Sequence, residues 1–168
     1  LGNRAKNGGV SSVDLVKTFT AWKNYYHKNT GEEVAATLLI NNADKITIVN
    51  SVLQKNIGNQ NLMYLTSCKK TLIMESQFLR NSAKKSSLIF IEHFKEFSTI
   101  GNNFRKNFET GVINLVKGEK YLDTNNFYYN NFAKENGACI TLFNVDDFSV
   151  VLSKIKYNSA LKAGGAIW

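Results

Sequence analysis

Apolar residues recur at helical spacing in several parts of this chain. Leu15, Phe19, Trp22 and Tyr26 lie three or four positions apart, after a serine at 11 or 12 that can cap a helix. A comparable pattern predicts helices from residue 44 to about 55 and over 87–97. Further helices are predicted at 103–109, 127–135 and 144–155.

Shorter apolar runs, bounded by polar residues, predict strands. They lie near 62–66, 71–78, 111–116 and 138–143, and the run at 34–40 fits either a strand or a helix. The polar residues 67–70 join the first two runs and predict a β-hairpin, with one continuous helix left open. Lys117 and Gly118 are suited to a tight turn into residues 119–122. The pattern predicts an α/β fold with a central mixed sheet flanked by helices; the alternative is a mainly α fold.

The 168 residues fit one domain, and neither a linker nor a composition boundary interrupts them. Residues 1–10 are rich in glycine and asparagine, which predicts a flexible start. One internal similarity relates residues 37–44 to 141–146. Both are apolar runs followed by polar, acidic residues, and we interpret them as ordinary strand-to-helix junctions without inferring a repeat.

The chain is basic, with a net charge of +8 and an isoelectric point near 9.5. An excess of cations favours polyanionic partners through counterion release. We therefore expect the surplus cations to lie on one side of the protein and to bind nucleic acid, leaving open an anionic membrane surface or a merely solvated exterior. The candidate contacts are Lys69, Lys70, Arg80, Lys84, Lys85, Arg105 and Lys106.

Other features limit the function classes. Cys68 and Cys139 are far apart, which favours reduced core thiols and a cytoplasmic protein over a zinc site or a disulfide framework. Because no apolar run approaches roughly 20 residues, no membrane partner is expected. Among the aromatic residues, Tyr128 and Tyr129 lie between asparagines and are the best candidates for stacking on bases.

One constellation resembles a known family. Glu75 and Gln77 alternate along a predicted strand, Asn61 precedes the strand before it, and two lysines follow at 84 and 85. Over residues 60–156 this order resembles the restriction-endonuclease-like nucleases of the PD-(D/E)xK class. The resemblance implies a catalytic site at Glu75, Gln77 and Asn61, with Glu75 as a ligand of Mg²⁺, which assists phosphodiester hydrolysis.

The resemblance departs from the family pattern at Asn61, where an acid is expected. One carboxylate and an amide hold Mg²⁺ less well than two carboxylates. If Asn61 is native, the site is therefore either inactive or uses another acid, such as Asp44, Glu32 or Glu33. Whether Asn61 is native or an engineered change stays open.

The sequence therefore predicts a nucleic-acid-binding protein, with metal-dependent endonuclease activity as the reaction implied by the resemblance. The alternative is a non-enzymatic nucleoprotein or packaging protein, of viral type and mainly helical. A toxin or effector fragment is a third reading, and a homodimer is left open.

Overall fold

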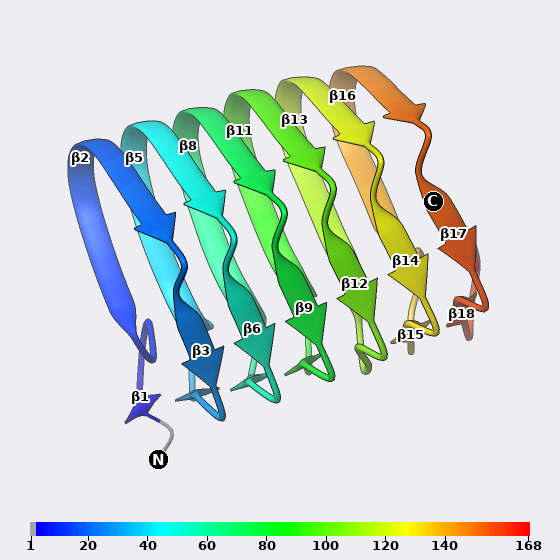
Figure 1. Cartoon of the computed structure of the whole chain (residues 1–168), viewed down its shortest axis with the longest axis horizontal. Helices are drawn as coiled ribbons and strands as arrows, with labels where there is room; N and C mark the ends of the chain where they lie inside the picture. The colour runs from blue at the N-terminus through cyan, green and yellow to red at the C-terminus, as the bar shows by residue number, and fades with distance from the viewer. Residues whose placement is uncertain (1–2) are drawn as a thin grey trace.

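The computed structural model describes residues 3–168, and over that range the chain winds into a parallel β-solenoid without any helix (Figure 1). Each coil contributes one long strand, one three-residue strand and, in most coils, one two-residue strand. Equivalent strands of successive coils pair in parallel, so the sheets run along the solenoid axis.

Three groups of strands build the coils. The long strands form a six-stranded sheet: β2 (Ser11–Trp22), β5 (Ala35–Val49), β8 (Asn61–Met74), β11 (Ser87–Ile100), β13 (Gly111–Thr124) and β16 (Ile140–Val151). The three-residue strands form a second six-stranded sheet: β3 (Tyr25–His27), β6 (Val52–Gln54), β9 (Gln77–Leu79), β12 (Asn103–Arg105), β14 (Phe127–Tyr129) and β17 (Lys154–Lys156). The two-residue strands are β1 (Arg4–Ala5), β4 (Thr30–Gly31), β7 (Ile57–Gly58), β10 (Ser82–Ala83), β15 (Phe132–Ala133) and β18 (Ser159–Ala160).

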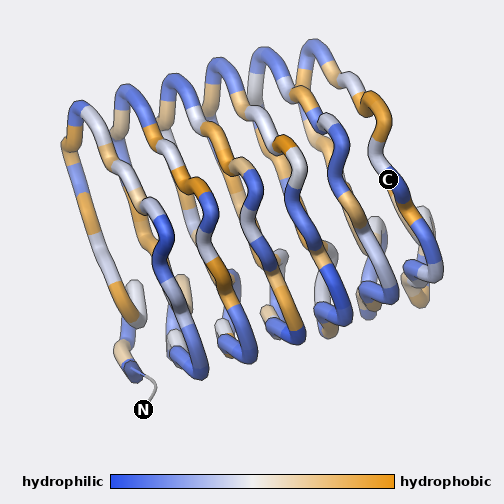
Figure 2. The backbone as a smooth tube through the Cα atoms, viewed as in Figure 1, coloured by the Kyte–Doolittle hydropathy of each residue, from blue (hydrophilic) through white to orange (hydrophobic). Residues whose placement is uncertain are grey.

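Each coil bends at residues in the left-handed backbone region. In the coil that starts with β8, these residues are Ser67, Glu75 and Arg80, with φ values of 53°, 49° and 54°. The same three places are left-handed in the neighbouring coils, because stacked coils must share one path. Hydrophilic residues occupy most of these bends, and the tube in Figure 2 shows them as blue stretches repeated from coil to coil.

Inward side chains stack in columns along the axis. One column, from the middle of the first five three-residue strands, contains Tyr26, Leu53, Phe78, Phe104 and Tyr128, all buried. The ring centroids of Phe78 and Phe104 are 4.8 Å apart, as are those of Phe104 and Tyr128. This spacing is close to the separation of paired strands, about 4.8 Å, so the coil repeat itself stacks the rings.

Two polar columns lie inside the bends. In one, the backbone N–H of each asparagine donates to the side-chain Oδ1 of the asparagine in the next coil, at 2.9–3.1 Å. Its members are Asn3, Asn29, Asn56, Asn81, Asn107, Asn131 and Asn158. The second column is made of Asn24, Ser51, Ser76, Asn102, Asn126 and Ser153, bonded in the same manner. These ladders satisfy backbone groups that the bends remove from the sheets.

A buried carboxylate lies in the fifth coil. Asp123 is fully buried, and it accepts hydrogen bonds from the hydroxyls of Thr99, Tyr121, Tyr128 and Ser153. Such a charge is tolerated in a core because several donors surround it.

The expected α/β fold is wrong, and so is the mainly α alternative, since residues 3–168 consist of strands joined by bends and contain no helix. The segment predicted as a helix over 87–97 shows why. Ile91, Phe94 and Phe97 are all buried within strand β11, although they are spaced by three. The left-handed bend at His93 turns the strand, so that inward positions around it are three apart and not two. A bent strand therefore imitates the helical period.

The other predicted helices, at 11–30, 44–55, 103–109, 127–135 and 144–155, are likewise strands and bends of the solenoid. The predicted β-hairpin at 62–78 is also wrong. Residues 62–66 and 71–74 belong to one strand, β8, which pairs in parallel with β5 and β11.

The turn expected at Lys117 and Gly118 is a bend within β13. The predicted strands at 111–116 and 138–143 overlap β13 and β16, and residues 34–40 overlap β5.

The nuclease resemblance is overturned with the fold. The PD-(D/E)xK pattern needs a hairpin and flanking helices, and the described residues form parallel coils instead.

The similarity between residues 37–44 and 141–146 comes from a structural repeat and not from strand-to-helix junctions. Through the paired registers, Asp44 and Asp146 occupy one column of the solenoid, as do Asn42 and Asn144, so the two segments are copies of one repeat.

Part of the segment expected to be flexible, residues 1–10, lies outside the described residues, namely Leu1 and Gly2. Within the rest, Arg4–Ala5 pairs with Thr30–Gly31.

Candidate polyanion-binding face

One outer face of the solenoid carries nearly all of the net charge. It consists of the three-residue strands with the bends before and after them, residues 23–28, 50–55, 75–80, 101–106, 125–130 and 152–157, and we call it the basic face. It follows the row of strands from β3 to β17 along the lower front of Figure 1. Of the 21 lysines and arginines, eight lie on it: Lys23, Lys28, Lys55, Arg80, Arg105, Lys106, Lys154 and Lys156.

The basic face has a single acid, Glu75, out of the 13 in the chain. The remaining 13 cations and 12 acids nearly cancel over the rest of the protein. All eight cations of the face are exposed, and within residues 3–168 none is paired with a carboxylate. Cations elsewhere are often paired, for example Lys69 with Asp44 at 2.7 Å. Most of the surplus positive charge therefore lies on this one face.

Four of these cations form a row. Lys28, Lys55, Arg80 and Lys106 occupy the same left-handed bend in four successive coils, and the backbone N–H of each donates to the coil that follows. Neighbouring coils are about 4.8 Å apart. Like charges on adjacent coils repel one another weakly through water, and a bound polyanion would replace this repulsion with attraction.

Aromatic side chains accompany the cations at both ends of the face. At the N-terminal end, Nζ of Lys23 is 4.5 Å from the ring centroid of Trp22, whose side chain is 60% exposed. At the C-terminal end, the guanidinium of Arg105 is 5.1 Å from the ring centroid of Tyr129. Combined basic and aromatic groups suit ligands that offer both anions and flat rings.

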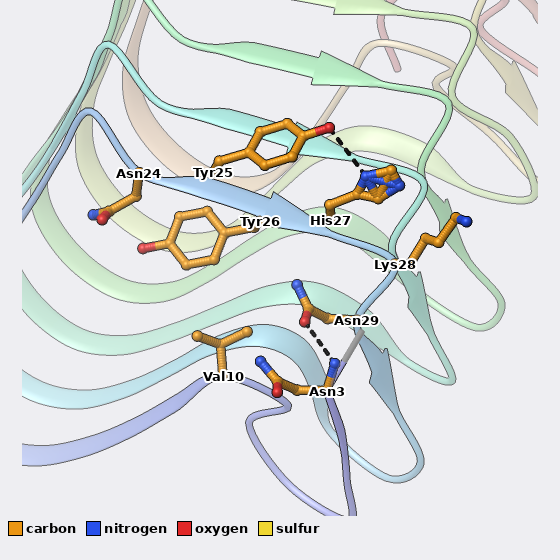
Figure 3. Close-up of a pocket in the computed structure, with 8 residues that line it drawn as sticks. All are labelled: Asn3, Val10, Asn24, Tyr25, Tyr26, His27, Lys28 and Asn29. Atoms are coloured by element: carbon orange, nitrogen blue, oxygen red, sulfur yellow. Dashed lines mark hydrogen bonds between the residues drawn. The ribbon is translucent and has the colours of Figure 1, made fainter. Parts of the chain in front are cut away.

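An open cavity of about 570 Å³ borders the N-terminal end of the basic face (Figure 3). Its lining includes Tyr25, Tyr26, His27 and Lys28 from β3 and the following bend. The Tyr25 hydroxyl donates to Oε1 of Gln54 at 2.9 Å and is 3.0 Å from Nδ1 of His27. The other ring nitrogen of His27 is buried and has no hydrogen-bond partner among residues 3–168. Burial raises the pKa of Tyr26 above its ordinary value.

The nucleic-acid contacts expected from the sequence divide between faces. Arg80, Arg105 and Lys106 lie on the basic face, with the first and last in the row of four. Lys69 and Lys70 lie on the long strand β8 and pair with Asp44 and Glu96. Lys84 and Lys85 are exposed beyond β10, on another side of the coil.

The residues assigned to a nuclease site do not form one. Glu75 and Gln77 are exposed near the start of β9, whereas Asn61 is buried at the start of β8, where its Oδ1 accepts the N–H of Ser87 at 3.4 Å. Among the described residues, no group of three or more histidine, cysteine or acidic side chains could hold a metal ion. The predicted Mg²⁺ ligand, Glu75, therefore stands alone on a cationic surface.

The contacts predicted from the sequence do not include Lys23, Lys28 or Lys55, and the row was not predicted. A signal for the row was present, because a cation directly precedes asparagine in Lys28–Asn29, Lys55–Asn56, Arg80–Asn81 and Lys106–Asn107. Those asparagines are 25–27 residues apart. Of the tyrosines proposed to stack on bases, Tyr128 is fully buried, while Tyr129 faces outward beside Arg105.

A comparison with protein-family models, curated proteins and solved structures finds no match to this chain. Within residues 3–168 there is also no helix of the length and apolarity that a bilayer crossing requires. The two cysteines are both buried and free.

Proposed function

We propose that the protein is a binding module for an extended polyanion, and that this polyanion is a nucleic acid held along the basic face. The observation that carries the proposal is the unequal distribution of charge. Eight exposed cations and one acid share this face, while the rest of the surface is close to neutral. Charge confined to one side is what a polyanion site requires, whereas solubility alone needs no such separation.

The shape of the face supports a ligand that lies along the solenoid axis. The row of Lys28, Lys55, Arg80 and Lys106 repeats once per coil and extends over about 14 Å at a coil spacing of about 4.8 Å. A linear array of cations matches a linear array of phosphates better than it matches a single small anion. Aromatic side chains at the ends of the face favour a nucleic acid among linear polyanions, because bases stack on such rings.

The test is a binding titration with a labelled 16-nucleotide oligothymidine at several salt concentrations. The variant Lys55→Gln/Arg80→Gln/Lys106→Gln is expected to bind at least about tenfold more weakly than the wild type. Since each phosphate contact to a single strand contributes about 0.7 to the slope of log K against log salt, the variant's slope should be smaller by about 2.

The matched control is Lys45→Gln/Lys84→Gln/Lys85→Gln, which removes the same charge from exposed positions outside the basic face. Its affinity should stay close to that of the wild type. Equal losses in the two triple variants would overturn the proposal, as would binding that does not depend on salt. Binding of a polyuronate or a sulfated polysaccharide without binding of the oligonucleotide would overturn the nucleic-acid assignment.

A further inference from the structure

The C-terminal end of the basic face carries a compact group of outward aromatic rings. Phe127 and Tyr129 are the two outward residues of β14, and their ring centroids are 5.6 Å apart at an angle of 24°. The ring of Tyr157, in the next coil, meets Tyr129 edge-on at 5.4 Å and 83°. We call these three residues the aromatic platform.

The three rings of the aromatic platform are not part of the hydrophobic core. Tyr157 is 76% exposed, and Phe127 and Tyr129 are only partly covered. The inward residue of the same strand, Tyr128, is fully buried and already fills the core at this level. The platform therefore adds flat apolar surface on the outside of the coil, where water must be in contact with it.

Cations border the platform on both sides along the axis. Through the strand registers, Tyr129 lies between Arg105 and Lys156, and Phe127 has Lys154 as its neighbour in the following coil. The Arg105 guanidinium is within 5.1 Å of the Tyr129 ring centroid. Flat rings between cations can hold a base by stacking while the adjacent phosphates contact the charged groups.

We infer, building on the proposed function, that the ligand is single-stranded and that one or two of its bases stack on Phe127, Tyr129 and Tyr157. A duplex keeps its bases stacked on one another, so it can offer the platform only its backbone. A single strand offers base faces, and stacking on an aromatic side chain contributes about 1–3 kcal/mol per base. The row of cations then holds the backbone and the aromatic platform selects single strands.

The solenoid itself suggests a variant that removes the rings with little damage to the fold. At the equivalent positions of other coils, Val52 replaces Phe127, Leu79 replaces Tyr129 and Asn130 replaces Tyr157. The variant Phe127→Val/Tyr129→Leu/Tyr157→Asn therefore uses side chains that this coil path already accommodates. Tyr64→Leu/Phe90→Asn is the control, because it removes the stacked pair on the long-strand sheet, at 5.2 Å, and also borrows residues from its own columns, Leu39 and Asn114.

The experiment compares three ligands of equal length: oligothymidine, an abasic deoxyribose-phosphate strand and a duplex. Wild-type protein should bind oligothymidine at least about fivefold more tightly than the abasic strand, and the platform variant should lose this preference while still binding the abasic strand. A 2-aminopurine placed in the oligonucleotide should be quenched by the wild type and by the control variant, but not by the platform variant.

Equal affinity of the wild type for the abasic strand and for oligothymidine would overturn this inference and leave the proposed function standing. An unchanged preference in the platform variant would overturn it as well. Failure of the proposed function looks different, because the wild type would then bind none of the three ligands, or the Lys55/Arg80/Lys106 variant would bind as the wild type does.

Discussion

The buried side chains of Asn81 and Asn107 join two coils through a pair of hydrogen bonds. The backbone N–H of Asn81 donates to Oδ1 of Asn107 at 2.9 Å, and its side-chain Nδ2 donates to the same oxygen at 3.2 Å. Asn81 also accepts two hydrogen bonds from Asn56 and donates to the carbonyl of Leu53. Asn81 therefore connects three successive coils of the solenoid.

Asn81→Ala is expected to lower the free energy of unfolding by about 3 kcal/mol or more, because it leaves several buried donors and acceptors without partners. Urea unfolding followed by circular dichroism measures the change. Gln60→Ala is the control, since Gln60 is exposed, and it should alter stability by about 0.5 kcal/mol or less. A loss below 1 kcal/mol for Asn81→Ala would show that the ladder is not a main support of the fold.

Gly118 provides the space for the ring of Phe94 in the adjacent strand, where the two are register partners. A Cβ added at Gly118 would come within 2.0 Å of the ring. Because Phe94 is buried, Gly118→Ala should destabilise the protein by about 1–3 kcal/mol. In a double-mutant cycle with Phe94→Val, the double variant should lose about 1 kcal/mol or more less stability than the sum of the two single losses. Additive losses would contradict this packing.

The bend at Ser67 has a positive φ of 53°, and Ser67 is exposed. Because β-branched side chains tolerate this conformation poorly, Ser67→Val should cost about 1–2 kcal/mol. Ser67→Gly should leave the free energy of unfolding unchanged or raise it by up to about 1 kcal/mol, since glycine adopts this conformation without a steric penalty. Lys95→Val is the comparison, because Lys95 is exposed on the neighbouring strand β11 and makes no ion pair within residues 3–168. Equal effects of the two valine substitutions would show that the bend is not left-handed in solution.

Alkaline pH should unfold the protein through its buried tyrosines. Burial, with Asp123 as a further cause, raises the pKa of Tyr121 and of Tyr128 well above the ordinary value of 10. In the unfolded chain these groups lose their protons near pH 10, whereas the folded protein keeps them. Their contribution to stability is therefore complete below pH 10 and decreases above it, by up to about 1.4 kcal/mol per pH unit for each tyrosine.

Cys68 also lowers the stability at alkaline pH, and its effect begins at a lower pH than that of the tyrosines, because burial raises its pKa from 9.0 to about 11. The tyrosine contribution is isolated by comparing wild type with Tyr128→Phe in urea unfolding between pH 8 and 11. The variant should be less stable at neutral pH, since Asp123 loses a donor, but its stability should fall less steeply above pH 10. Parallel curves for the two proteins would rule out Tyr128 as an alkaline trigger.

Part of the fold was accessible from the sequence. The apolar runs at 111–116 and 138–143 predict strands, and strands are found at both places. The spacing of Leu15, Phe19, Trp22 and Tyr26 predicts a helix instead. Leu15 is 80% exposed because it lies at a left-handed bend, and a second bend at Lys23 precedes the buried Tyr26. A bend changes which residues face inward, and most of the bends contain neither proline nor glycine as a marker. The asparagine repeat was the available signal, and spacings that vary from 24 to 27 residues obscured it.

By itself the sequence determined the amounts: a surplus of eight positive charges, enough apolar residues for a core, and asparagines at intervals close to one coil. Only the tertiary structure decided where those charges lie. Arg80 and Lys106 are 26 positions apart in the chain but neighbours on the surface, while Lys69 lies closer to Arg80 in sequence and on another side of the coil. The physical reason is the stacking of coils, because parallel pairing between strands about 25 residues apart turns a periodic sequence into straight rows of side chains.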